Sequence, residues 1–199
     1  MRPHAEAAAP PSGVSKSTAA VTNAAPSFHD GVPMQRVMEL YERESRRVGQ
    51  IDPDPKATQK RLEEDARELQ PAEIRWLEGQ GADLKNDADA RFFAVYLLGL
   101  SHQQEAVGAL GRLALSTIPK SKNDRLVEQE RAFRASAVEG LSHLCGDFAQ
   151  DVKDHLLNIV SLQRDEFLRD RANRGLYTCQ YGKPMEDQDR EALEKLRTK

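Results

Sequence analysis

Apolar side chains recur every three or four residues along most of this chain from Met34 onward, and polar side chains fill the positions between them. This spacing places the apolar groups on one face of an α-helix, so the pattern predicts an all-α protein. Glycine, proline and polar segments separate the periodic stretches and mark the helix ends. The expected helices span residues 34–48, 55–69, 71–78, 87–100, 103–117, 124–145, 148–162, 165–179 and 185–197.

The first 81 residues differ from the rest of the chain. Ala, Pro, Ser, Thr and Val dominate the first residues, which lack large apolar groups, so we expect residues 1–33 to be a disordered Ala/Pro-rich tail or linker. Residues 34–81 are expected to form a helical cap in which Trp76 anchors the core. Gly79 and Gly81 are expected to end its last helix.

Residues 82–199 contain an imperfect repeat. An arginine precedes an alanine by three residues in three of the expected helices, and the pairs are Arg91 with Ala94, Arg134 with Ala137, and Arg169 with Ala172. Gly-Leu-Ser-His also occurs twice, at 99–102 and 140–143. Small residues at helical spacing let neighbouring helices approach closely, so we expect the three alanines at tight helix contacts.

The segment Arg-x-x-Ala-x-x-Leu-Leu-Gly at 91–99 resembles the first helix of HEAT-type repeats, and the later copies match its Arg-x-x-Ala core. The resemblance implies a short right-handed α-solenoid of about three HEAT-like hairpins, with residues 34–81 as its N-terminal cap. A period between 20 and 50 residues is typical of such stacked architectures. Three amphipathic hairpins in an irregular bundle remain an alternative.

Charge and hydropathy exclude some classes of partner. The 199 residues carry 29 basic and 32 acidic side chains, a net charge of −3, which does not favour a nucleic-acid partner. The longest apolar run, Phe92 to Leu100, is too short to span a bilayer, so no membrane span is expected. An Ala/Pro/Ser/Thr tail often tethers an exported domain to an envelope, which favours a bacterial periplasm slightly over the cytoplasm.

The two cysteines, Cys145 and Cys179, fit neither a zinc site nor a disulfide-rich scaffold. They lie near the ends of two expected neighbouring helices, where a bridge needs an oxidising compartment and a Cα separation at the upper limit for a disulfide. The sequence leaves open whether they form one.

Motifs with a built-in mechanism are missing from the sequence. It has no Gly-rich phosphate loop, no Gly-x-Ser-x-Gly, no His-Glu-x-x-His and no Cys-x-x-Cys, so we expect no enzyme, no cofactor and no metal. His102 and His143 occupy the same place in two repeats. We expect each to lie at a helix C-terminus, where the helix dipole favours a cation.

The resemblance implies a non-catalytic scaffold or adaptor that binds another protein, with the second helix of each hairpin lining the concave face. Burying the apolar face of 103–117 turns Gly108 and Arg112 outward, and burying that of 148–162 exposes Asp154 and Asn158. These four residues are the expected partner-binding site. The alternative is a HEAT-like nucleic-acid-binding protein or a DNA glycosylase-type enzyme, which would need a basic groove containing an aromatic side chain and a carboxylate.

Overall fold

The computed structural model describes residues 35–45, 54–186 and 189, and every regular element in this part of the chain is an α-helix. The expected tail at 1–33 and most of the last expected helix, from Asp187 onward apart from Asp189, lie outside the described residues. The all-α prediction is confirmed for the rest. The helices are α1 (Gln35–Ser45), α2 (Pro55–Arg67), α3 (Pro71–Ala82), α4 (Ala88–Leu100), α5 (Gln104–Leu115), α6 (Asp124–His143), α7 (Cys145–Leu162) and α8 (Glu166–Tyr181).

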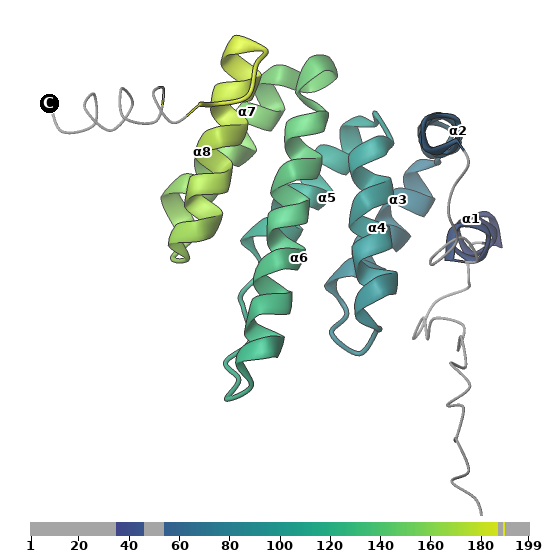
Figure 1. The fold of residues 1–199 in the computed structure, drawn as a ribbon, viewed down its shortest axis with the longest axis horizontal. Helices are drawn as coiled ribbons and strands as arrows, with labels where there is room; N and C mark the ends of the chain where they lie inside the picture. Colours follow the sequence, from purple (N-terminus) through teal and green to yellow (C-terminus); the bar gives the residue numbers. More distant parts are fainter. Residues whose placement is uncertain (1–34, 46–53, 187–188, 190–199) are drawn as a thin grey trace, which may run out of the picture.

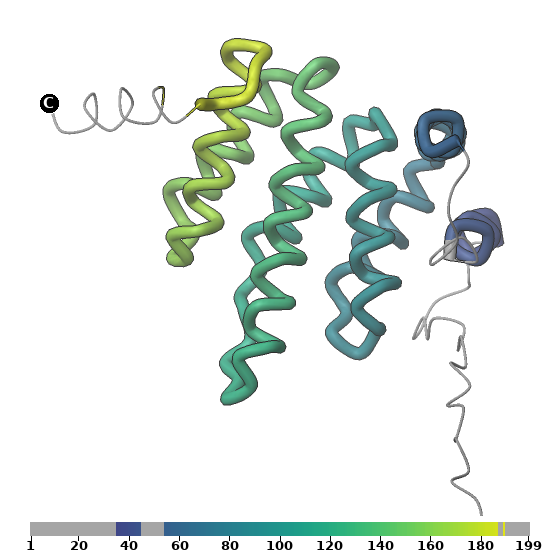
Figure 2. Tube along the Cα trace, viewed as in Figure 1, coloured from purple at the N-terminus to yellow at the C-terminus, as the bar shows by residue number. Residues whose placement is uncertain are grey.

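From α2 onward the helices form two layers. Helices α2, α4, α6 and α8 pack side by side in one layer, and α3, α5 and α7 pack in the other. Figure 1 shows α4, α6 and α8 in front, with α3, α5 and α7 behind them. The tube in Figure 2 shows that consecutive helices from α3 onward run in alternating directions, whereas α1 and α2 are seen nearly end-on. The first two helices therefore cross the direction of the later ones.

The core lies between the two layers. Leucines of both layers make up much of it, including Leu97, Leu98, Leu110, Leu113, Leu141 and Leu156, each at most 2% exposed. The repeat alanines Ala94, Ala137 and Ala172 are also within 1% of full burial, as their spacing predicts. Trp76 packs against this core with part of its ring exposed, at the edge of the core rather than its centre.

Two of the repeat arginines perform the same task in successive hairpins. Arg91 on α4 donates from Nε to the carbonyl of Gly81, near the end of α3, at 3.0 Å. Arg134 on α6 donates to the carbonyls of Ser116 and Thr117, directly after α5, at 2.7 and 2.6 Å. The last carbonyls of a helix have no partner within it, so Arg91 supplies a missing donor at the end of α3, while Arg134 fixes the two residues that follow α5. The Arg-x-x-Ala repeat thus has a structural basis.

Both arginines bind the same buried carboxylate. Glu130 on α6 accepts from Arg91 through both of its oxygens and from Arg134 Nη1 at 2.7 Å. The three side chains are 7%, 2% and 11% exposed for Arg91, Arg134 and Glu130. The Arg91 guanidinium also lies 4.3 Å from the centre of the Phe133 ring, a cation–π contact. This Arg91–Glu130–Arg134 cluster joins α4 to α6 inside the protein.

The third copy departs from the pattern. Arg169 lies exposed on α8, whereas its counterparts on α4 and α6 are buried. Here Gln163, which follows α7, donates to the carbonyl of Ala114 at 3.1 Å and so connects the end of α7 back to α5. The third Arg-x-x-Ala motif therefore shares its buried alanine with the first two copies and not its buried arginine.

The glycines of the two Gly-Leu-Ser-His motifs meet where α4 and α6 pack together. A Cβ atom at Gly99 would lie 2.9 Å from the Cα of Gly140, and a Cβ at Gly140 would lie 3.3 Å from the Cα of Gly99. The two backbones are close enough that neither position has room for a side chain. Gly99 and Gly140 are 41 residues apart in the sequence, whereas Arg91 and Arg134 are 43 residues apart. Both spacings therefore reflect contacts made in the fold.

Gly99→Ala is expected to destabilise the protein by about 1–3 kcal/mol, because the added methyl group would meet backbone that cannot rotate away. Alanine is the better helix former by about 1 kcal/mol, so the clash must outweigh that gain. Gly79→Ala in α3 is the matched control, since a Cβ there meets nothing within 4 Å and the variant should be neutral or more stable. Urea denaturation of both variants tests this, and equal effects would contradict the close approach.

Several helix ends differ from those expected. Helix α3 continues through Gly79 and Gly81 to Ala82, because Gly81 faces Leu113 and Phe133 rather than a turn. Asn123, not Asp124, is the N-cap of α6. Helix α7 spans Cys145–Leu162 and is kinked at Phe148, the residue where the helix was expected to begin.

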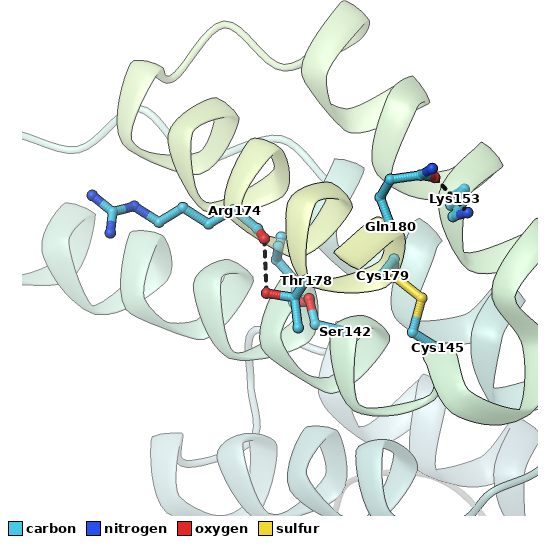
Figure 3. Close-up of a disulfide and its surroundings, with 8 residues drawn as sticks. Ser142, Cys145, Lys153, Arg174, Thr178, Cys179 and Gln180 are labelled. Atoms are coloured by element: carbon cyan, nitrogen blue, oxygen red, sulfur yellow. Dashed lines mark hydrogen bonds between the residues drawn. A yellow bond between two sulfur atoms is a disulfide. The ribbon is translucent and has the colours of Figure 1, made fainter. Parts of the chain in front are cut away.

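A disulfide joins Cys145, the first residue of α7, to Cys179 near the end of α8. Their Cα atoms are 5.5 Å apart, which resolves the question that the sequence left open. Figure 3 shows the bridge between the two helices, with the Lys153–Gln180 hydrogen bond close by. In the same view Thr178 donates to the carbonyl of Arg174 within α8. The last described hairpin is thus closed covalently.

Candidate interaction groove

A groove of about 550 Å³ crosses the layer made by α3, α5 and α7. It is an open surface feature, and polar side chains form most of its walls. Helix α3 contributes Ile74, Arg75 and Glu78; α5 contributes Gln104, Glu105, Val107, Gly108 and Arg112; and α7 contributes Asp151, Asp154, His155 and Asn158. Three neighbouring helices of one layer therefore supply one wall each.

Helix α5 faces the groove with the side that its sequence predicts. Val107, Leu110 and Ala114 are at most 1% exposed, which turns the opposite side of the helix outward. Gly108 and Arg112 both line the groove, and the Arg112 side chain is 64% exposed.

Helix α7 follows the same rule. Val152, Leu156 and Ile159 are fully buried, and Asp154 and Asn158 are exposed along the groove. The structure thus brings together all four residues selected from the sequence, which come from helices more than thirty residues apart in the chain.

The α3 wall was missed by sequence reasoning. Arg75 and Glu78 lie on the groove because Ile74 and Leu77 are buried, at 1% exposure each, and turn the polar side of α3 outward. The same periodicity that identified the faces of α5 and α7 could have found them. Residues 34–81 were instead assigned to a cap, and α3 was expected to end at Gly79.

An ion pair ties the α3 wall to the α5 wall. Arg112 donates from Nε and Nη2 to the two carboxylate oxygens of Glu78, at 2.6 and 2.8 Å. These hydrogen bonds raise the pKa of the Arg112 guanidinium above its ordinary value, so it stays charged. The guanidinium also folds back over Gly108, where a Cβ would lie 3.2 Å from Nη1. A partner that approaches the backbone at Gly108 must therefore displace the Arg112 side chain.

Two contacts connect the beginning of α5 to α7. The amide of Gln104 donates to the Asp151 carboxylate, and His102, just before α5, bonds the Asp147 carboxylate. His102 follows the C-terminus of α4 with a φ of 51°, so it adopts a left-handed backbone conformation where that helix ends. His143 is the last residue of α6 and is exposed. Both histidines therefore lie at helix C-termini, as expected.

Farther along α5, Gly111 faces the ring of His155 on α7, with no room for a side chain between them. The small residue lets α5 and α7 approach each other beneath the groove. A glycine inside a helix costs about 1 kcal/mol relative to alanine. The close approach of His155 explains why Gly111, one of the two glycines inside α5, is present despite that cost.

Two searches of the described residues bear on the class of site. No group of three or more His, Cys, Asp or Glu side chains among them is arranged to hold a metal ion. None of the helices in the described ranges is both long and apolar enough to cross a membrane.

Comparison of the chain with protein-family models, with curated proteins and with solved structures finds no match in any of the three. The function is therefore argued from the groove and the packing of the helices.

Proposed function

We propose that this chain is a non-catalytic protein–protein interaction module, a short HEAT-like solenoid that binds a protein partner along the α3–α5–α7 groove. The observation that carries the proposal is the groove itself: three neighbouring helices of one layer, α3, α5 and α7, each supply one exposed, polar face to it. Stacked hairpins that expose equivalent helices to one extended surface are typical of repeat proteins that recognise other proteins.

The repeat-like packing supports the solenoid part of the proposal. Equivalent helices of successive hairpins pack against one another in both layers, and Arg91 and Arg134 bind the end of the preceding second-layer helix in the same way. An irregular bundle would not require such equivalence. Helices α1 and α2, which cross the others, suit a terminal cap.

The nucleic-acid alternative gains no support from the groove. Its lining contains four carboxylates, two guanidiniums and no Phe, Tyr or Trp, whereas phosphate binding needs an excess of basic groups. A mobility shift with duplex DNA at low salt tests this alternative. Tight, salt-sensitive binding would overturn the proposal in favour of a nucleic-acid-binding protein.

Photo-cross-linking locates the binding surface and identifies the partner. A cross-linking amino acid at Asn158, on the groove, is expected to capture a partner from the source cells. The same amino acid at Ala132, exposed on α6 in the other layer, serves as the matched control. Equal capture from both positions would show that the groove is not the specific surface.

The double variant Arg112→Glu with Asp154→Lys is expected to weaken binding of the captured partner by about tenfold or more, because it reverses charges on two walls of the groove. Both side chains are exposed, so the circular dichroism spectrum should not change. Affinity is measured by titration calorimetry with the purified partner. Full affinity with an intact fold would move the site away from this groove.

A further inference from the structure

The charges along the groove are not balanced. Glu78 and Arg112 neutralise each other through their paired hydrogen bonds. Three carboxylates then remain, those of Glu105, Asp151 and Asp154, against the single guanidinium of Arg75. The excess negative charge lies on the α5 and α7 walls, and the basic group lies on α3.

Neutral amides are the partners of two of these carboxylates. Gln104 donates to Asp151, and Gln150 donates to Asp154 at 3.0 Å. An amide donor fills one acceptor position of a carboxylate and leaves its charge uncompensated. Within the described ranges of the chain, no Lys or Arg side chain forms an ion pair with Glu105, Asp151 or Asp154.

The groove exposes no large aliphatic or aromatic side chain to an occupant. Its two aliphatic residues, Ile74 and Val107, are each 1% exposed, so they support the walls from beneath. An amphipathic helix binds a groove by packing apolar anchors against such side chains. The polar lining instead suits a segment held by its charged side chains.

We propose that the groove binds an extended basic segment of a partner protein, with Lys or Arg at alternate positions. This inference rests on the proposed function and adds the chemistry of the partner. Charge complementarity selects the basic side chains, since carboxylates form their strongest hydrogen bonds with Arg and Lys. Three helices packed about 8–10 Å apart span roughly 20 Å. An extended chain covers that distance in about six residues.

Basic residues at alternate positions can reach two neighbouring walls of the groove. In an extended segment, alternate side chains point the same way and lie about 6.6 Å apart. The long, flexible side chains of Arg and Lys cover the difference between this step and the roughly 8–10 Å between helix axes. One basic side chain can then reach Asp151 and Asp154 on α7, while the second reaches Glu105 on α5.

Fluorescence anisotropy with labelled hexapeptides tests the inference on the full chain. A peptide that alternates Arg and Ala is expected to bind about tenfold tighter than the same peptide with Gln in place of Arg. Asp151→Asn with Asp154→Asn should lower the affinity for the Arg peptide by about tenfold. The control Glu64→Gln with Glu166→Gln removes the same charge from exposed positions outside the groove and should change affinity less than about twofold.

Two results would overturn the inference: equal binding of the Arg and Gln peptides, or equal loss in the groove and control variants, which would indicate a diffuse charge effect. The proposed function is tested by a different result from the one that tests this inference. If Arg112→Glu with Asp154→Lys weakens binding of the cross-linked partner while the Arg peptide does not bind, only the basic-segment inference is wrong. If that variant keeps full affinity for the partner and Asn158 captures the partner no better than Ala132 does, the groove itself is wrong.

Discussion

Glu130→Gln is expected to lower the free energy of unfolding by about 3–5 kcal/mol, the usual cost of removing one partner from a buried ion pair. The substitution keeps the size of the side chain and removes its charge. It leaves two buried guanidiniums, those of Arg91 and Arg134, without a counter-charge. Urea denaturation followed by circular dichroism measures the change.

Glu128→Gln is the matched control, two residues away on the same helix. Glu128 is 65% exposed and pairs with Arg131 at the surface, so its removal should cost less than about 1 kcal/mol. If the two variants lose similar stability, the Arg91–Glu130–Arg134 cluster does not hold α4 and α6 together as we infer.

The pH dependence of the free energy of unfolding is a second test of the stabilising role of Glu130. Burial opposes its charged form, but the hydrogen bonds from Arg91 and Arg134 outweigh that effect and hold the pKa of Glu130 below its ordinary value of 4.5. A lowered folded-state pKa stabilises the protein above the unfolded pKa, and that contribution is lost as the pH falls through the folded pKa. The difference in stability between wild type and Glu130→Gln should therefore shrink at acidic pH.

Removing the disulfide with Cys145→Ala and Cys179→Ala is expected to cost about 3–4 kcal/mol, because the bridge restricts the unfolded chain across a separation of 34 residues. Among the described helices, α8 should show the largest loss of protection from hydrogen exchange. It packs mainly against α6 and α7, and the disulfide is its covalent link to α7. Exchange measured by mass spectrometry, together with urea denaturation, tests both parts.

Wild-type protein measured in reductant distinguishes the effect of breaking the disulfide from the effect of removing the two sulfur atoms. It should have nearly the stability of the double alanine variant, and reductant should leave that variant unchanged. Two reactive thiols in the unfolded, unreduced wild type would contradict the bridge. Disulfides persist in oxidising compartments. Finding the bridge in protein purified from its own cell would therefore support the predicted periplasmic location, which otherwise stays a prediction.

These stability variants also serve the study of binding. The groove is formed by α3, α5 and α7, so its shape depends on how the neighbouring helices hold these three in place. The Arg91–Glu130–Arg134 cluster joins α4 to α6, and the disulfide joins α7 to α8, both away from the groove lining. A groove variant that loses affinity without losing stability therefore reports on recognition, whereas a loss of both reports on the fold.

Helical periodicity in the sequence was enough to predict the helices and the outward faces of α5 and α7. Burying Val107 and Leu110, or Val152 and Leu156, fixes the rotation of each helix, because these apolar groups must leave water together. That rotation exposes Arg112 and Asp154 without knowledge of any neighbouring helix. The repeated arginines and glycines could also be seen in the sequence, although their contacts could not.

Only the tertiary structure decided which distant residues meet. Glu130 has an ordinary place on a polar stretch of α6, and its burial follows from the arrival of Arg91 from another hairpin. Cys145 and Cys179 come within bonding range because α7 and α8 pack together, which local spacing does not determine. The α3 wall lines the groove because α3 packs against α5, which places Arg75 and Glu78 beside Arg112 and Gly108. Helical periodicity shows which face of each segment is buried, whereas the contacts between segments depend on the three-dimensional packing of the whole chain.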